Sequence, residues 1–147
     1  MRVSRFVLLL VTLAIVVVGV RALRPAPRSP EDQVKAVVED MAKGARDHDA
    51  PAVMDHVSES FRSSELGSKP ELKAYVLGEL LRGGVVEARV LESRAELLPG
   101  GEVVFTGRLF LGRTAGGLDL GQQAVQATFV NEDGTWRALR AHVEPVR

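Results

Sequence analysis

The chain has 147 residues, enough for one domain with an extension, and its 46% hydrophobic and 26% charged residues are ordinary for a folded protein. Residues 1–30 hold five arginines and no acid, whereas residues 31–147 hold 14 Lys and Arg against 19 Asp and Glu, a net charge of −5. An acidic domain without a dense basic stretch argues against nucleic-acid binding, and the absence of cysteine excludes disulfides, thiolate catalysis, iron–sulfur clusters and lipid attachment through cysteine.

Residues 1–23 have the pattern of a membrane-directing leader. A basic start precedes an uncharged run of 15 residues from Phe6 to Val20, which matches the apolar region of a signal peptide. This run is shorter than the roughly 20 residues that span a bilayer comfortably. We expect either a signal peptide cleaved after Ala22 or an uncleaved anchor. The arginines beyond the run favour the uncleaved anchor. The domain is then tethered through residues 6–20 on the outer side of the cell membrane, or is secreted or periplasmic.

A proline-rich linker, residues 24–30, leads into a domain at residues 31–147. Ser29 is a predicted helix N-cap, Pro30 suits the first helical position, and the acids that follow favour the positive end of the helix. The predicted helix continues to about Asp47, with one apolar stripe at helical spacing. The stripe consists of Val34, Val37, Val38, Met41, Ala42 and Ala45.

Two further helices are predicted before the spacing of the hydrophobic residues changes from helical to alternating. The first is short and is capped by Asp49, and its residues Val53, Met54 and Val57 are expected to face inward. Residues 58–64 are irregular or form a short strand around Phe61. The next helix begins at Ser68 and ends at the glycine pair 83–84, because glycine accepts the left-handed cap conformation. Its apolar face comprises Leu72, Tyr75, Val76, Leu80 and Leu81.

From residue 85 onward the hydrophobic pattern alternates, which is typical of strands. Turn signals at residues 99–101, 115–117 and 133–134 divide this half into four strands, at residues 85–98, 102–113, 118–130 and 135–144. The short connections make neighbouring strands antiparallel. One face is apolar, with Val103, Phe105, Leu109, Leu111, Val125, Ala127, Phe129, Leu139, Ala141 and Val143. The other is mixed, with Arg108, Gln126, Thr128, Arg140 and His142.

One apolar and one mixed face predict an α+β fold. An N-terminal apolar helix is followed by three helices packed on one face of an antiparallel sheet of four or more strands.

Three segments carry a resemblance to a known superfamily: the passage between helices at residues 45–54, the segment 58–61 with its phenylalanine, and the closing segment 130–137, where an acidic-glycine turn precedes Trp136. Together they resemble the nuclear transport factor 2-like superfamily, also called SnoaL-like or cystatin-like, over about residues 31–145. The resemblance implies a sheet curved around the helices into a cone, often with an apolar pocket. Members include isomerases, dehydratases, cyclases and non-enzymatic binding or assembly modules, some tethered by an N-terminal membrane segment. Architecture alone does not fix function.

An isomerase of this kind would need an inward carboxylate as base and an inward tyrosine or protonated acid as oxyanion donor. The inward residues of the first helix are apolar, and the sole tyrosine, Tyr75, is expected in the core with its hydroxyl at the rim. A bulge could turn inward one acid of the first long strand, among Glu87, Glu92 and Glu96. We expect no catalytic residue.

Histidines offer two weaker candidates. A cluster is formed by His48, Asp49, Asp55 and His56. Metal ligation needs three or four convergent ligands, so we expect a helix cap and histidines near helix C-termini, where positive charge is favoured. His142 alternates with Arg140 and Trp136 along the last predicted strand. We expect this face to be exposed or to form a dimer contact. In an enzyme, His142 would instead be a general acid or base.

We therefore expect an exported or membrane-tethered, non-catalytic module that binds a small apolar ligand or an envelope protein partner. No cofactor, metal or nucleic acid is expected, and a homodimer could form through the sheet face. The candidate pocket residues are Met41, Met54, Phe61, Tyr75, Phe105, Phe129 and Trp136. Two alternatives remain: a secreted isomerase or dehydratase acting on a small apolar substrate, and a structural subunit of an envelope complex.

Overall fold

The computed structural model describes residues 28–82, 86–113 and 121–147. The predicted leader, most of the linker, the glycine pair 83–84 and the predicted turn at 115–117 lie outside the described residues. Within the described ranges, no helix is long and apolar enough to cross a membrane.

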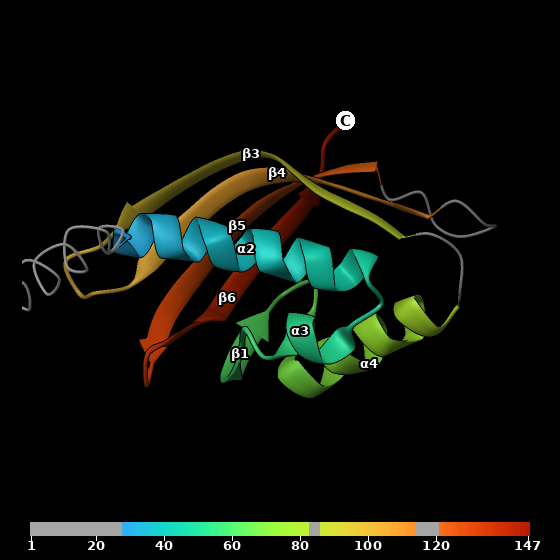
Figure 1. Ribbon diagram of the computed structural model, residues 1–147, viewed down its shortest axis with the longest axis horizontal. Coiled ribbons are helices and arrows are strands. Elements are labelled where there is room, and N and C mark those ends of the chain that lie inside the picture. The colour runs from blue at the N-terminus through green and yellow to red at the C-terminus, as the bar shows by residue number, and fades with distance from the viewer. Residues whose placement is uncertain (1–27, 83–85, 114–120) are drawn as a thin grey trace, which may run out of the picture.

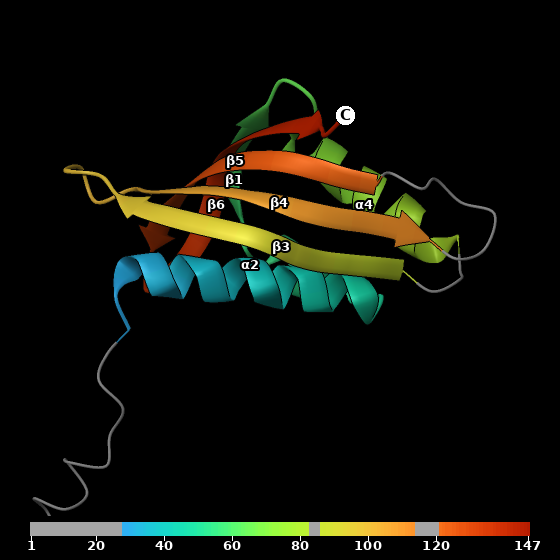
Figure 2. The ribbon, with the colours of Figure 1, turned by 90° about the horizontal axis from the view of Figure 1, so that it is seen from above.

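The described part of the chain is an α+β fold with three helices and one six-stranded sheet (Figure 1). The strands lie in the order β2-β1-β6-β5-β4-β3. The sheet arches over α2, which runs beside β3 (Figures 1 and 2). In chain order the elements are α2 (Pro30–Arg46), α3 (Ala50–Met54), β1 (Val57–Ser63), β2 (Gly67–Ser68), α4 (Lys69–Leu81), β3 (Val86–Leu97), β4 (Val103–Arg113), β5 (Gly121–Glu132) and β6 (Thr135–Pro145).

Side-chain caps determine where the three helices begin. Ser29 caps α2 and Asp49 caps α3, and each side chain accepts a hydrogen bond from the backbone N–H three residues on, at 3.2 and 3.1 Å. At the start of α4, Ser68 and Glu71 form a capping box, in which the Ser68 N–H donates to Glu71 Oε2 at 2.6 Å. The predicted starts of all three helices are therefore confirmed.

The core lies between α2 and the inner face of the sheet. Burial of apolar surface there, at roughly 25 cal/mol per Å², is the main favourable term in folding. The buried cluster consists of Val34, Val38, Met54, Val57, Phe61, Val103, Phe105, Ala127, Phe129, Trp136 and Ala138. Both halves of the chain contribute to it, so the helices and the sheet form one domain.

The segment at residues 58–64, predicted as irregular or a short strand, forms most of β1. This strand runs parallel to β6, with Val57 opposite Ala138 and Arg62 opposite Arg140. The sheet is therefore mixed, and the prediction of a purely antiparallel sheet is wrong. Parallel partners need a long crossover, and here α4 and four strands separate β1 from β6, so no local turn marks the pairing.

The last strand contains a β-bulge at Leu139. Across β5, Phe129 is opposite Ala138 and Thr128 is opposite Arg140, which leaves Leu139 without a partner. An extra residue in one strand reverses the alternation of its side chains and bends the strand.

The bulge corrects two predictions for β6. Ala141 and Val143, beyond the bulge, line the inner side as predicted, but Trp136, before it, is also inside. Trp136 is buried, and its Nε1 donates to Gln33 Oε1 at 2.9 Å. The placement of Trp136 on the mixed face and of Leu139 on the apolar face is wrong, because strict alternation fails at a bulge.

Candidate ligand-binding site

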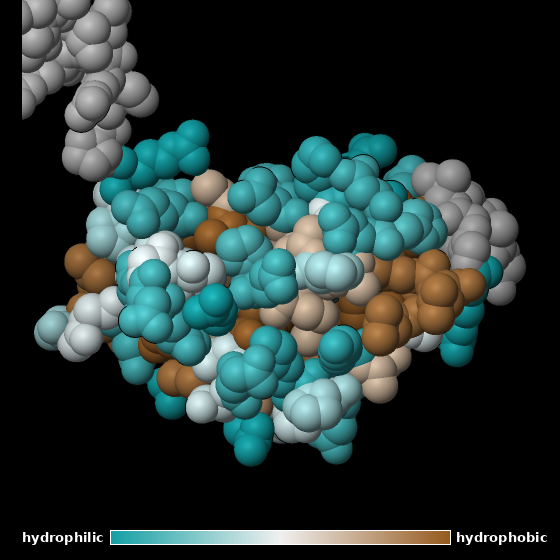
Figure 3. All heavy atoms as spheres, turned by 60° about the horizontal axis from the view of Figure 1, so that its bottom comes forward, coloured by the Kyte–Doolittle hydropathy of each residue, from teal (hydrophilic) through white to brown (hydrophobic). Residues whose placement is uncertain are grey.

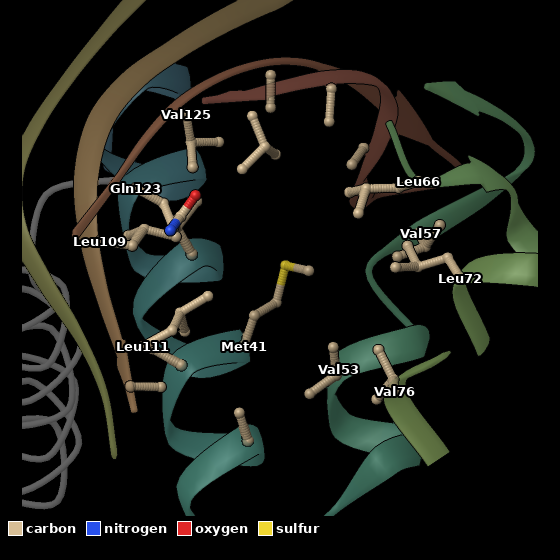
Figure 4. Close-up of a pocket in the computed structure, with 18 of the residues that line it drawn as sticks. Met41, Val53, Val57, Leu66, Leu72, Val76, Leu109, Leu111, Gln123 and Val125 are labelled. Carbon is tan, nitrogen blue, oxygen red and sulfur yellow. The ribbon is translucent and has the colours of Figure 1, made fainter. Parts of the chain in front are cut away.

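A cavity of about 440 Å³ lies between the inner face of the sheet and the three helices (Figure 4). Small-molecule sites typically enclose roughly 300–1,000 Å³. Met41 of α2, Val53 of α3 and Val76 of α4 point into this space from one side, and Leu109 and Val125 face them from the sheet. All three helices and the sheet contribute to its wall.

Small side chains and strand curvature leave this space open. Bulges at Leu139 and at Leu91 bend the sheet; at the second, Val90 is opposite Leu109 and Glu92 is opposite Arg108. Alanines occupy wall positions where larger side chains would fill the interior: Ala42, Ala45, Ala88, Ala127, Ala138 and Ala141.

Five of the seven candidate pocket residues line the cavity. They are Met41, Phe61, Tyr75, Phe105 and Phe129. Met54 and Trp136 are buried in the adjoining core instead.

Tyr75 is 48% exposed, so the prediction that it is a core aromatic is wrong. None of the residues of α4, all within the described ranges, is buried, and Leu81 of its predicted apolar face is 81% exposed. The helix packs on β1, β2 and α3 at the edge of the domain rather than over the centre of the sheet.

Apolar surface gathers at the end of the molecule that carries α4 (Figure 3). Tyr75, Leu77 and Leu81 are its exposed large side chains. A second cavity of about 160 Å³ extends between α4 and the adjoining ends of β3 and β4, and it shares Tyr75 and Val76 with the main cavity. The apolar interior therefore continues toward this end of the domain.

Among the described residues that line the main cavity, four have polar side chains: Glu65, Tyr75, Arg89 and Gln123. Tyr75 and Arg89 are exposed, and Arg89 Nη2 lies 3.8 Å from Glu87 Oε2. Gln123 is only 8% exposed, and its amide points into the cavity (Figure 4). The prediction missed Gln123, although its alternation with Val125 on β5 places it on the inner face.

Glu65 was also missed, and it links the cavity wall to β6 through His142. His142 Nδ1 lies 2.9 Å from Glu65 Oε1, and its Nε2 lies 2.8 Å from Glu144 Oε1. Hydrogen bonds from the Ser64 hydroxyl, then from Ser63 and His142, lower the pKa of Glu65 to about 2. The carboxylates of Glu144 and Glu65 raise the pKa of His142 above its usual 6.5.

This link predicts a pH-dependent thermal stability. A raised pKa means that the stabilisation is fully present below pH 6.5 and is lost as the pH rises through the folded-state pKa of His142. We expect the difference in Tm between the wild type and His142→Gln to be largest in mild acid and to shrink above neutrality. Melting curves across this range check it, and a constant difference would contradict it.

The remaining candidates do not form a site. His48 Nδ1 lies 3.0 Å from the carbonyl oxygen of Leu80, and His56 Nδ1 lies 3.2 Å from that of Trp136. In the described ranges, no group of three or more His, Cys, Asp or Glu residues could hold a metal ion.

The acids of β3 do not line the main cavity. The Leu91 bulge puts Glu92 opposite Arg108 on the outer face, where the two side chains form an ion pair. Glu96 is exposed, and Glu87 is paired with Arg89. The bulge that could have turned one of these acids inward is present, but it turns none of them toward the cavity.

No protein-family model matches the sequence, and no curated protein matches it. Solved structures match its fold. A nuclear transport factor 2-like protein of unknown function from Pseudomonas putida is 12% identical, with a TM-score of 0.64 over 78% of this chain and 84% of that one. An uncharacterised protein with a cystatin-like fold from Caulobacter vibrioides is 11% identical, with a TM-score of 0.65 over 79% and 89%.

A protein of unknown function from Mycobacterium tuberculosis is 20% identical, with a TM-score of 0.60 over 78% of this chain and 70% of that one. At these identities the comparisons show the fold alone. The described domain therefore has the cystatin-like, nuclear transport factor 2-like fold that the sequence predicted.

Proposed function

We propose that the domain is a non-catalytic binding module that holds a small apolar ligand between α2 and the sheet. The cavity of about 440 Å³ is the observation that carries this proposal. Protein interiors are close-packed, and each unfilled apolar space lowers stability because its walls lose van der Waals contacts. A ligand that fills the cavity would restore those contacts, so the cavity favours binding.

The leader suggests where the module works. We propose that residues 1–23 direct the domain to the outer side of a membrane or into export, and that residues 24–30 separate it from the bilayer. This proposal rests on the apolar run from Phe6 to Val20.

Binding of a neutral apolar probe tests the proposed function. We expect naphthalene to bind the full chain at one saturable site, because a compact aromatic molecule fits an apolar cavity of this size. Calorimetric titration of the chain in lipid nanodiscs measures this, with empty nanodiscs as the blank for partition into lipid. If the heat of titration, after subtraction of the blank, shows no saturation, the proposal is contradicted.

The contact between Glu65 and His142 favours an enzyme as the second candidate. An isomerase or dehydratase would use a carboxylate at the cavity as its base, and Glu65 occupies such a place. A general base works best with a pKa near the working pH, whereas the pKa of Glu65 is about 2. Binding without catalysis is therefore the better-supported function. Turnover of an enolisable ketone that Glu65→Gln abolishes would establish the enzyme instead.

A further inference from the structure

Gln123 is a polar side chain in an otherwise apolar part of the cavity wall. It stands on β5 between Leu109 of β4 and Pro145 of β6, and it is almost fully buried. Its amide lies on the sheet side of the open space, which Met41 enters from α2 (Figure 4). Burying an amide costs free energy that only hydrogen bonds offset, so a leucine would suit an all-apolar cavity better.

The charges around the cavity disfavour an anionic ligand. The arginine among the lining residues, Arg89, has a side chain that is 66% exposed and is paired with Glu87. Glu65 is ionised at neutral pH, since its pKa is about 2. A buried anion would lose its hydration without gaining a cation and would be repelled by Glu65.

The surroundings of Glu65 also disfavour a cationic ligand. The carboxylate of Glu65 already accepts hydrogen bonds from Ser63 and Ser64 and lies against His142. An incoming ammonium group would have to compete with these partners for the carboxylate oxygens. The polar group that faces the buried interior is therefore the neutral amide of Gln123.

We propose that the cavity takes a neutral, largely apolar molecule with one hydroxyl or carbonyl group, and that Gln123 binds that group. An amide has two N–H donors and an oxygen with two lone pairs, so it can bind a ligand alongside its partner in the protein. The inference rests on the proposed function and adds the chemistry of the ligand. A single hydrogen bond contributes about 1 kcal/mol net, which corresponds to roughly fivefold in affinity.

Three probes that share one ring system and differ in head group test this inference: naphthalene, naphthol and naphthoate. For the full chain we expect naphthol to bind roughly fivefold more tightly than naphthalene, and naphthoate at least tenfold more weakly than naphthol, by the same titration. In Gln123→Leu the preference for naphthol over naphthalene should vanish while naphthalene still binds. Gln122→Leu, on the same strand but exposed and facing outward, is the matched control and should keep the wild-type preference.

The outcomes separate this inference from the proposed function. If naphthalene binds but naphthoate binds as tightly as naphthol, the neutral-ligand inference fails and the apolar cavity stands. If Gln123→Leu keeps the naphthol preference, Gln123 is not the binding group. If none of the three probes binds, the proposed function itself fails. The wild-type comparison of the three probes decides the ligand's charge even where a variant folds poorly.

Discussion

Replacing Val125 by tryptophan should remove naphthalene binding, with an affinity loss of at least about a hundredfold. Val125 points from β5 into the middle of the cavity, opposite Met41 (Figure 4). An indole ring there occupies the volume that a ligand needs. Calorimetric titration of Val125→Trp against naphthalene measures the loss.

The same variant should keep or raise its stability. Added bulk usually costs about 1–3 kcal/mol in a packed core, but at Val125 the indole enters space that is already open. Val130→Trp is the matched control, since Val130 lies on the outer face of the same strand, opposite Arg137. It should bind like the wild type. Wild-type affinity in Val125→Trp would place the ligand outside the cavity.

Truncating Phe105 should cause the largest loss of stability, about 3–5 kcal/mol in the free energy of unfolding. Its ring is 1% exposed and lies over Gly107, where an added Cβ would stand 2.8 Å from Phe105 Cζ. The ring also borders the cavity, so its removal enlarges an existing void that the surrounding structure cannot close. Denaturant unfolding of Phe105→Ala measures the change.

Phe110→Ala is the control for this truncation. Phe110 lies on the same strand but faces outward and is only partly buried, so its truncation removes less buried surface and opens no internal void. We expect a clearly smaller loss. Equal losses for the two phenylalanines would contradict the assignment of the inner face as the core.

Much of the fold could be predicted because its signals are local. The cap at Ser29 and the apolar stripe of α2 lie within a few residues of each other, as do the turn at residues 133–134 and the strands it joins. The pairing of β1 with β6 could not be predicted, because it joins Val57 to Ala138 across α4 and four strands. Non-local pairing depends on the assembled sheet and leaves no periodic mark in either segment.

The site was harder to predict than the helices and strands, because bulges change which side chains face inward. One extra residue at Leu139 moved Trp136 from the expected outer face into the core. The bulge at Leu91 was anticipated in β3, but its effect on Glu92 depends on the register with β4. Gln123 could not be singled out from the sequence, because its amide carries no charge and belongs to no motif.

The position of bound naphthalene can be measured directly by NMR. We expect intermolecular nuclear Overhauser effects from the bound ring to the methyl groups of Met41, Leu109 and Val125, which point into the cavity (Figure 4). Leu77 and Leu81, exposed on α4, should give none. Contacts confined to Leu77 and Leu81 would show that the ligand binds the outer surface and would contradict binding in the cavity.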